Sequence, residues 1–222
     1  MIRHFHFETL SSTQDEIFRL FEKKEVSPFL VTTDEQTSGR GRMGRIWNSE
    51  KGRSLTMSLG VKLPAAKILG LSLAVGLGVR EALSEESLQL KWPNDLMMNN
   101  EKVGGILIES KSHGDLAEIA IGVGVNLFDQ QSVSFKGIKK QISSEFVAEK
   151  ILNRLEPFSQ KGFIYFKSEY EKYMWNRGKE IRLKIQDEEK LVLAVGVSEK
   201  GYLITRDGEE LAMTDQGEIL WS

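Results

Sequence analysis

A change of pattern near residue 176 constrains the fold of this chain more than any other feature of its sequence. Before that point, apolar residues in segment 65–83 recur at steps of three and four, which is typical of a helix packed on a sheet, and strand-like runs flank it. After Lys179, five short alternating runs are separated by turns that contain glycine. We therefore predict an α+β chain with two units: helices and strands over residues 1–176, and a small antiparallel β-barrel over residues 177–222.

The composition excludes several classes of protein and of site. No cysteine occurs among the 222 residues, which removes disulfides, thiolate metal sites and cysteine nucleophiles. The formal net charge of −2 argues against electrostatic binding of nucleic acid or anionic membrane by the chain as a whole. The longest apolar stretch, residues 68–79, is shorter than the roughly 20 residues that a membrane helix needs. We therefore expect a soluble, cytoplasmic protein that does not bind a membrane.

A glycine-rich segment, Gly39-Arg40-Gly41-Arg42-Met43-Gly44, imitates the dinucleotide-binding fingerprint G-x-G-x-x-G. Its context does not fit, because that fingerprint opens a helix directly after a strand. Here five residues separate the segment from the preceding strand candidate, and the residues that follow do not form a helical pattern. A dinucleotide-binding βαβ unit is therefore rejected.

The same region is strongly basic, with five basic residues and one acidic residue across 39–53. Glycines allow the backbone to approach a ligand, and Arg40, Arg42 and Arg45 offer planar forks to phosphate or carboxylate oxygens. Trp47 adds a flat surface on which a purine could stack. A solvated surface loop is the alternative. Anion binding is favoured, with ATP, nucleic acid and an acidic protein all open as the anion.

Three further segments place polar residues in or at the ends of apolar strands, and the last two also carry glycines within the strand. The first, 91–95, reads Lys-Trp-Pro-Asn-Asp and ends a strand candidate; the second places Lys102 before Gly104 and Gly105; the third, 121–126, carries two glycines and ends in Asn126. Glycines inside strands usually mark a close approach to the backbone. The alternative is an ordinary hairpin that turns at residues 99–100, with a solvated lysine. Three convergent segments favour a ligand.

These motifs together resemble the biotin–protein ligase family in content, order and spacing: Gly39–Gly44 with Trp47, Lys91–Asp95, Lys102–Ile106 and Gly122–Asn126. The resemblance implies a seven-stranded mixed sheet with helices on one face, similar to class II aminoacyl-tRNA synthetases, followed by an SH3-like barrel. It also implies an enzyme with two half-reactions. Biotin and Mg-ATP form biotinyl-5′-adenylate and pyrophosphate, and the biotinyl group then passes to a lysine of a biotin carboxyl carrier protein.

The resemblance further implies which residues bind the substrates. Gln14 stands where the family more often has Asn. The residues expected to bind biotin are Ser12, Thr13, Gln14, Gln36, Arg40, Gly41, Arg42, Lys102, Gly104 and Gly105. Those expected to bind ATP or the adenylate are Arg42, Arg45, Trp47, Lys102 and Asn126.

The chemistry of the two half-reactions suggests catalytic roles for three residues of these motifs. Attack of a carboxylate on a phosphate brings two anions together, so Lys102 and Arg42 are expected to neutralise the developing charge, with Mg²⁺ arriving on ATP. In the second step the attacking amine must be neutral, and Asp95 is expected to orient or deprotonate it.

Several expectations concern partners and alternatives. The segment equivalent to the family's Ser-Thr-Asn begins at Ser12, which predicts a ligase without a preceding DNA-binding domain and without specific DNA binding. A homodimer is compatible with the sequence. One alternative is a lipoate–protein ligase, although its typical Arg-Arg-x-Ser-Gly-Gly-Gly stretch does not occur here. The other is a non-enzymatic nucleic-acid-binding module that uses residues 39–53.

Overall fold

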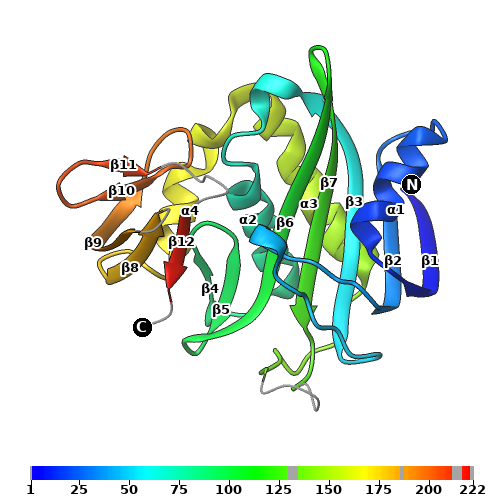
Figure 1. Ribbon diagram of the computed structural model, residues 1–222, viewed down its shortest axis with the longest axis horizontal. Coiled ribbons are helices and arrows are strands. Elements are labelled where there is room, and N and C mark those ends of the chain that lie inside the picture. Colours follow the sequence, from blue (N-terminus) through cyan, green and yellow to red (C-terminus); the bar gives the residue numbers. More distant parts are fainter. Residues whose placement is uncertain (1, 130–134, 186–187, 212–216, 221–222) are drawn as a thin grey trace.

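The computed structural model describes residues 2–129, 135–185, 188–211 and 217–220, and it confirms the α+β fold class (Figure 1). Its main feature is a seven-stranded mixed sheet in which β1 and β2 run parallel and the other neighbours antiparallel. In their order across the sheet, the strands are β1 (Arg3–Leu10), β2 (Phe29–Gln36), β3 (Ser54–Pro64), β7 (Leu116–Asn126), β6 (Glu101–His113), β5 (Asp95–Met98) and β4 (Leu88–Lys91).

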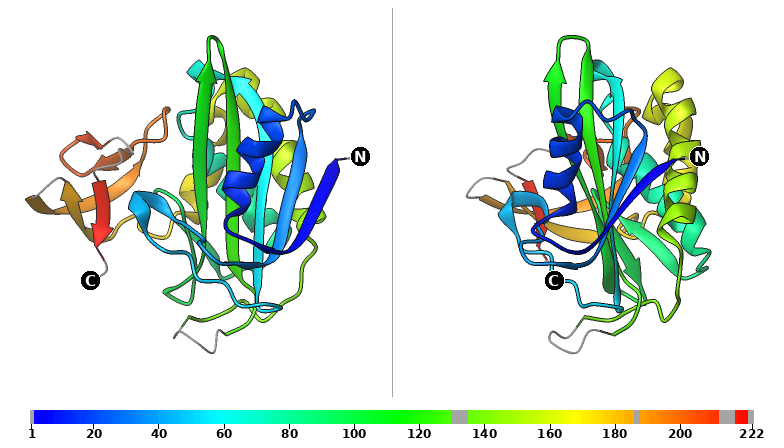
Figure 2. Two further views of the ribbon diagram at one scale, coloured as in Figure 1. Left: turned by 45° about the vertical axis from the view of Figure 1, so that its right-hand side comes forward. Right: turned by 90° about the vertical axis from the view of Figure 1, so that its right-hand side faces the viewer.

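Helices lie on both faces of this sheet (Figure 2). One face is covered by α2 (Leu71–Leu83) and α3 (Ser144–Lys161), with the short η3 (Phe163–Phe166) and α4 (Lys167–Tyr173) beside them. On the opposite face, α1 (Thr13–Glu22) packs near β2, β3 and β7. The sequence-based expectation had all helices on one face. The alternation of β2 explains the difference, because Phe29 and Val31 pack on the α1 side while Leu30 points into the main core.

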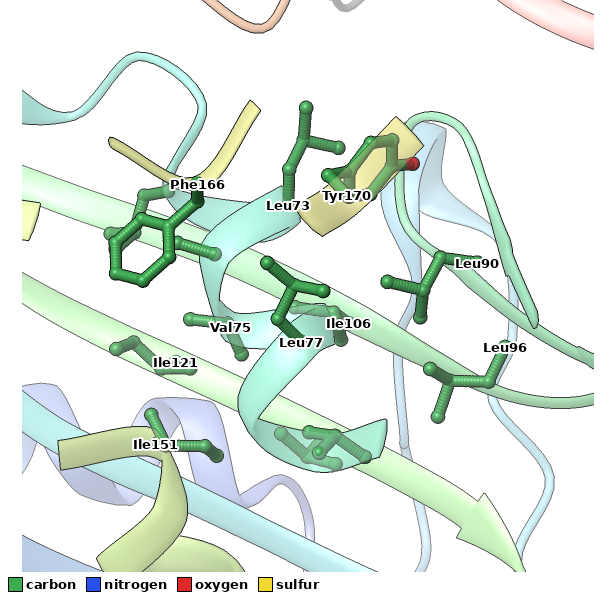
Figure 3. Close-up of a cluster of buried hydrophobic side chains, with 14 of the residues drawn as sticks. Leu73, Val75, Leu77, Leu90, Leu96, Ile106, Ile121, Ile151, Phe166 and Tyr170 are labelled. Atoms are coloured by element: carbon green, nitrogen blue, oxygen red, sulfur yellow. The ribbon is translucent and has the colours of Figure 1, made fainter. Parts of the chain in front are cut away.

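The main hydrophobic core lies between the sheet and α2 (Figure 3). Leu73, Val75 and Leu77 of α2 are almost fully buried against strand residues such as Ile106. A Cβ at Gly78 would lie 3.0 Å from the backbone of α3. This glycine therefore lets the two helices approach closely.

The apolar pattern after residue 143 predicts two helices, 144–155 and 158–175, starting after a cap at Ser143, and the structure divides this region differently. The first helix, α3, begins at the predicted cap, where the Ser143 hydroxyl accepts from the Phe146 backbone N–H at 3.2 Å. It then runs through Pro157 to Lys161. Burial of Phe158 favours the continued helix over a break at the proline, and Gly162, with φ of 73°, ends it.

The chain after residue 179 forms the five antiparallel strands that its pattern predicts. They are β8 (Glu180–Ile185), β9 (Glu188–Val197), β10 (Leu203–Thr205), β11 (Glu210–Leu211) and β12 (Gly217–Leu220), in the order β11-β10-β9-β8-β12. Closure into an SH3-like barrel stays a prediction. Trp92 joins this sheet to the main one, because its indole N–H donates to the Gly201 carbonyl at 3.0 Å. Within the described residues, no helix is long and apolar enough to cross a membrane.

Candidate active site

A cavity opens on the α1 face of the main sheet, over β3, β7 and β6. The basic segment with η1 (Arg42–Gly44) crosses this face on the same side as α1 (Figure 2). The cavity therefore has a sheet floor, an α1 wall and a loop cover. The sequence-predicted site residues that line it are Ser12, Thr13, Gln14, Gln36, Arg40, Gly41, Arg42, Arg45, Trp47, Asp95, Lys102 and Gly105.

Two predicted residues lie outside this lining. A Cβ at Gly104 would point at Leu96 and at the carbonyl of Gly124, so this glycine allows close strand packing behind the cavity wall. Asn126 is buried at the end of β7, where its backbone carbonyl accepts from the Ile138 N–H at 2.9 Å. The structure therefore brings neither residue to the cavity surface.

The floor of the cavity is made of glycines on which side chains rest directly. A Cβ at Gly124 would lie 2.4 Å from the indole ring of Trp47, and one at Gly122 would lie 3.1 Å from the amide of Gln14. Both distances are shorter than ordinary van der Waals contact. The two glycines of β7 thus allow one aromatic and one amide side chain to lie against the strand.

One end of the cavity is polar and preorganised. Ser12 caps α1, and the backbone N–H and hydroxyl of Thr13 both donate to the side-chain amide oxygen of Gln36, at 2.8 and 3.2 Å. The Ser58 hydroxyl donates to the Gln14 amide oxygen at 2.9 Å and lies 2.7 Å from the Thr13 hydroxyl. These side chains are held by one another, which fixes their positions for a ligand. Sequence reasoning missed Ser58, whose only signal was a polar residue among the apolar ones of β3.

An ion-pair network ties the loop to the wall of the cavity. Arg40 donates to both carboxylate oxygens of Asp15 on α1, at 2.9 and 2.6 Å, and to both of Glu109 on β6, at 3.2 and 3.1 Å. The hydrogen bonding of Arg40 to the Asp15 carboxylate is the largest cause that raises the pKa of Arg40 above its usual value. Sequence reasoning missed Asp15 and Glu109, because nothing local signals a pairing between residues so far apart in the chain.

The basic segment is itself a small hairpin. Arg40 and Ile46 form an isolated antiparallel bridge, and the Trp47 N–H donates to the Gly39 carbonyl at 2.9 Å. Arg42 donates to the Asn94 side-chain oxygen at 3.4 Å. The predicted loop thus covers the cavity and contacts the 91–95 segment.

The lysines stand at the opposite end of the cavity from Gln14. The Lys102 ammonium lies 2.6 Å from a carboxylate oxygen of Asp95, above Gly105. Lys91 is 3% exposed, and its pKa falls to about 8, chiefly because burial removes water from the ammonium; the Asp95 carboxylate opposes this shift, and nearby cations, Lys102 first, add to it. Sequence reasoning included Lys91 in a motif but gave it no role.

Two polar atoms of the lining lack protein partners. The Trp47 indole N–H and the Thr56 hydroxyl are buried without a hydrogen bond among the described residues. Buried polar groups are nearly always bonded, so the cavity suits a ligand that carries polar groups. Its cationic groups at the lysine end suit an anionic part of that ligand.

Comparison with known proteins identifies the family. A sequence profile described as the biotin/lipoate A/B protein ligase family matches residues 6–126. The chain belongs to this family. The match spans every cavity residue predicted from the sequence, so the resemblance inferred from the motifs is confirmed.

Individual relatives of the chain support the same family. It is 30% identical over 236 residues to the bifunctional ligase/repressor BirA of Bacillus subtilis, which covers 96% of this chain and 72% of that protein. It is 32% identical over 194 residues to the Escherichia coli protein of the same name, covering 78% of this chain and 60% of that one. The structure of biotin protein ligase from Aquifex aeolicus in complex with biotin and ATP superposes with a TM-score of 0.79, at 28% identity and over the whole of both chains.

Proposed function

We infer that the protein is a biotin–protein ligase, which activates biotin with ATP and transfers it to a lysine of a carrier protein. The observation that carries this conclusion is a single cavity with a preorganised polar end, a cationic end and a glycine floor between them. A neutral ring with polar groups fits the first end, and a carboxylate next to a triphosphate fits the second. The relatives in complex with biotin and ATP support the same assignment.

In the first half-reaction, an oxygen of the biotin carboxylate attacks the α-phosphorus of ATP, the bond to the β-phosphate oxygen breaks, and pyrophosphate leaves. Biotin would lie with its ring toward Thr13, Gln14 and Gln36. Lys102 and Arg42 would neutralise charge between carboxylate and phosphate. Since Lys102 is paired with Asp95 at 2.6 Å, substrate binding would exchange one anionic partner for another at little electrostatic cost.

The nucleotide would lie toward Arg45 and Trp47. The ring of Trp47 would stack on the adenine, and Arg45 would contact the phosphates. This assignment of the aromatic residue rests on the family resemblance together with its position in the cavity lining.

In the second half-reaction, the acceptor amine attacks the acyl carbon of the adenylate, the bond from that carbon to the phosphate oxygen breaks, and AMP leaves. The amine must first lose a proton, because a lysine is an ammonium ion near neutral pH. Asp95 would orient the incoming lysine once Lys102 has turned to the adenylate, and it would accept or relay the proton.

Magnesium would accompany ATP. Mg²⁺ usually takes one or two carboxylates and completes its shell with phosphates and water. Within the described part of the cavity lining, Asp95 supplies a carboxylate and Asn94 an amide oxygen. No cluster of three or more acidic or histidine ligands occurs among the described residues. This donor set fits an ion held mainly by the phosphates, with Asp95 near enough to contribute.

The remaining parts of the proposal concern organisation and partners. Residues 1–176 would form the catalytic unit, and residues 177–222 a barrel that docks the carrier or covers the ATP end. The acceptor would be a lysine of a biotin carboxyl carrier protein in the cytoplasm. We propose no specific DNA binding, and a homodimer is compatible with this function.

Both alternatives are weaker. The family name includes lipoate ligases, but the superposed Aquifex aeolicus structure is that of a biotin protein ligase in complex with biotin and ATP. A nucleic-acid-binding surface needs solvated cations, whereas Arg40 is held by two carboxylates. Lys51 lies 3.6 Å from a carboxylate oxygen of Asp34, and Arg53 donates to the Asp129 carbonyl at 2.8 Å.

The deciding experiment is biotin-dependent exchange of labelled pyrophosphate into ATP. The wild-type protein should exchange with biotin, and Lys102→Ala should lose at least about 100-fold, the usual effect of removing one preorganised charge-stabilising group. Exchange with lipoate alone would transfer the protein to the other branch of the family, and absence of exchange with both acids would refute the ligase assignment.

A further inference from the structure

One carboxylate, that of Glu109, connects the two walls of the cavity. Its Oε2 atom accepts from the Gln14 side-chain amide at 2.9 Å and from Arg40 Nη2 at 3.1 Å, while its Oε1 accepts from Arg40 Nε at 3.2 Å. Gln14 belongs to the polar end of the cavity, and Arg40 belongs to the loop that covers it. Glu109 therefore joins a residue beside the ligand to the cover above the ligand.

The amide of Gln14 has little freedom to choose another partner. It is 3% exposed, its oxygen accepts from Ser58, and Gly122 lies directly beneath it. Its nitrogen points at Glu109, with two backbone carbonyls at 3.4 and 3.5 Å as more distant acceptors. A shift of this amide must therefore move the Glu109 carboxylate or break the shortest of its donor contacts.

The length of the side chain at position 14 is what makes this contact. An asparagine, which the family more often carries, is shorter by one carbon–carbon bond, about 1.5 Å. From the same backbone position its amide would fall short of a carboxylate that Gln14 reaches at 2.9 Å. The connection to Glu109 is thus a property of glutamine at this position.

We propose that Glu109 is a positioning residue that couples biotin binding at Gln14 to ordering of the Gly39–Trp47 loop through Arg40. The proposal rests on the assignment of the cavity as a biotin site. A ligand that pins the Gln14 amide also pins the Glu109 carboxylate, and the carboxylate then holds Arg40 and the loop. Without Glu109, biotin still meets Gln14, but its binding is no longer communicated to the loop.

A comparison with Asp15 distinguishes coupling of biotin binding to the loop from simple anchoring of the loop through Arg40. It holds the same guanidinium with two hydrogen bonds, yet no hydrogen bond joins it to Gln14 among those of the described residues. Its carboxylate is more exposed than that of Glu109, 56% against 32%. Loss of Asp15 should loosen the loop equally in the biotin-bound and the biotin-free protein. Loss of Glu109 should instead remove the difference in loop order between the biotin-bound and the biotin-free protein.

The test compares Glu109→Gln with Asp15→Asn, and with Glu118→Gln as a control. Glu118 is a β7 carboxylate that pairs with Lys62 and His113, outside the cavity lining. Each variant is first checked for folding by thermal unfolding. Trypsin cleavage in the loop, with and without saturating biotin, then measures loop order, and steady-state pyrophosphate exchange gives KM for biotin and kcat.

Biotin should slow loop cleavage at least fivefold in the wild-type protein, in Asp15→Asn and in Glu118→Gln, but less than twofold in Glu109→Gln. The KM for biotin should rise about five- to tenfold in Glu109→Gln, with kcat within about twofold. Adding Gln14→Asn to Glu109→Gln should change this KM less than twofold, although Gln14→Asn alone raises it severalfold, because the two substitutions break the same connection.

Biotin protection that persists in Glu109→Gln, or additive effects of the two substitutions, would overturn the coupling. That failure is distinct from failure of the proposed function, in which the wild-type protein itself would show neither biotin protection nor exchange.

Discussion

Substitution of Gly124 by alanine tests whether the glycine floor exists to seat Trp47. A Cβ at this position would lie 2.4 Å from two carbons of the indole ring, whereas carbon atoms in contact sit about 3.5–4.0 Å apart, so the ring must move by roughly 1 Å or more. Gly124 does not adopt a positive φ, so alanine itself introduces no backbone strain.

The expected loss of stability in Gly124→Ala depends on how freely the groups displaced by the new Cβ can move. Overpacking in a rigid core costs about 1–3 kcal/mol. Here the displaced group belongs to a surface loop, and alanine also restricts the unfolded chain, which offsets about 0.4–1 kcal/mol. The free energy of unfolding should therefore fall by no more than about 2 kcal/mol.

The effect on ATP binding is estimated from the stacking of Trp47. A lost aromatic stacking contact is worth about 0.5–1.5 kcal/mol, which corresponds to a rise in KM for ATP of roughly two- to twelvefold.

Pyrophosphate exchange with varied ATP or varied biotin, together with thermal unfolding, measures these effects. Gly122→Ala is the matched control, because its Cβ would meet the Gln14 amide at 3.1 Å and not Trp47. Gly124→Ala should raise KM for ATP and leave KM for biotin within about twofold, and Gly122→Ala should do the reverse. Equal effects of both alanines on both substrates would refute the assignment of the two ends.

Three other outcomes are expected. Asp95→Asn should keep pyrophosphate exchange within about fivefold yet slow transfer to the carrier by about 100-fold or more; equal losses would place its effect in the first step. Burial lowers the pKa of Lys91 to about 8 in the folded chain, from 10.5 when the side chain is solvated. Between these two pH values the unfolded chain binds more protons than the folded chain, so the free energy of unfolding of the wild-type protein should rise with pH there. Urea unfolding at pH 7.5 and 9.5 should show this gain, on the order of 1 kcal/mol, and Lys91→Met should lack it. Trp92→Phe should lower the free energy of unfolding by about 1–3 kcal/mol, since it leaves the buried Gly201 carbonyl unbonded; a urea-measured change below about 0.5 kcal/mol would contradict that role.

Much of the fold could be predicted because the pattern of apolar residues is local. The apolar run at residues 116–126 predicts a strand and coincides with β7, and the hairpin considered for residues 99–100 is present, with positive φ at both asparagines. The helix boundary at Pro157 was wrong, because burial of the next residue outweighed the missing hydrogen bond of proline.

The candidate site was only partly predictable. The family resemblance singled out the glycine-arginine segment, Asp95 and Lys102, and the structure brings all of them to the lining of one cavity. Ser58 and Glu109 could not be predicted, since a serine or glutamate in a strand has the same local meaning whether or not it faces a cavity.

By itself, the sequence determined the α+β class, the succession of strands, the glycines of the cavity floor and the family, because each of these depends on neighbouring residues or on short motifs. Only the tertiary structure decided that α1 lies on the face of the sheet opposite α2 and α3, that Lys91 is buried, and that Glu109 joins Gln14 to Arg40. These features depend on which distant segments the sheet order brings together, and on how much water is removed between them. Neither quantity can be read from residues in chain order.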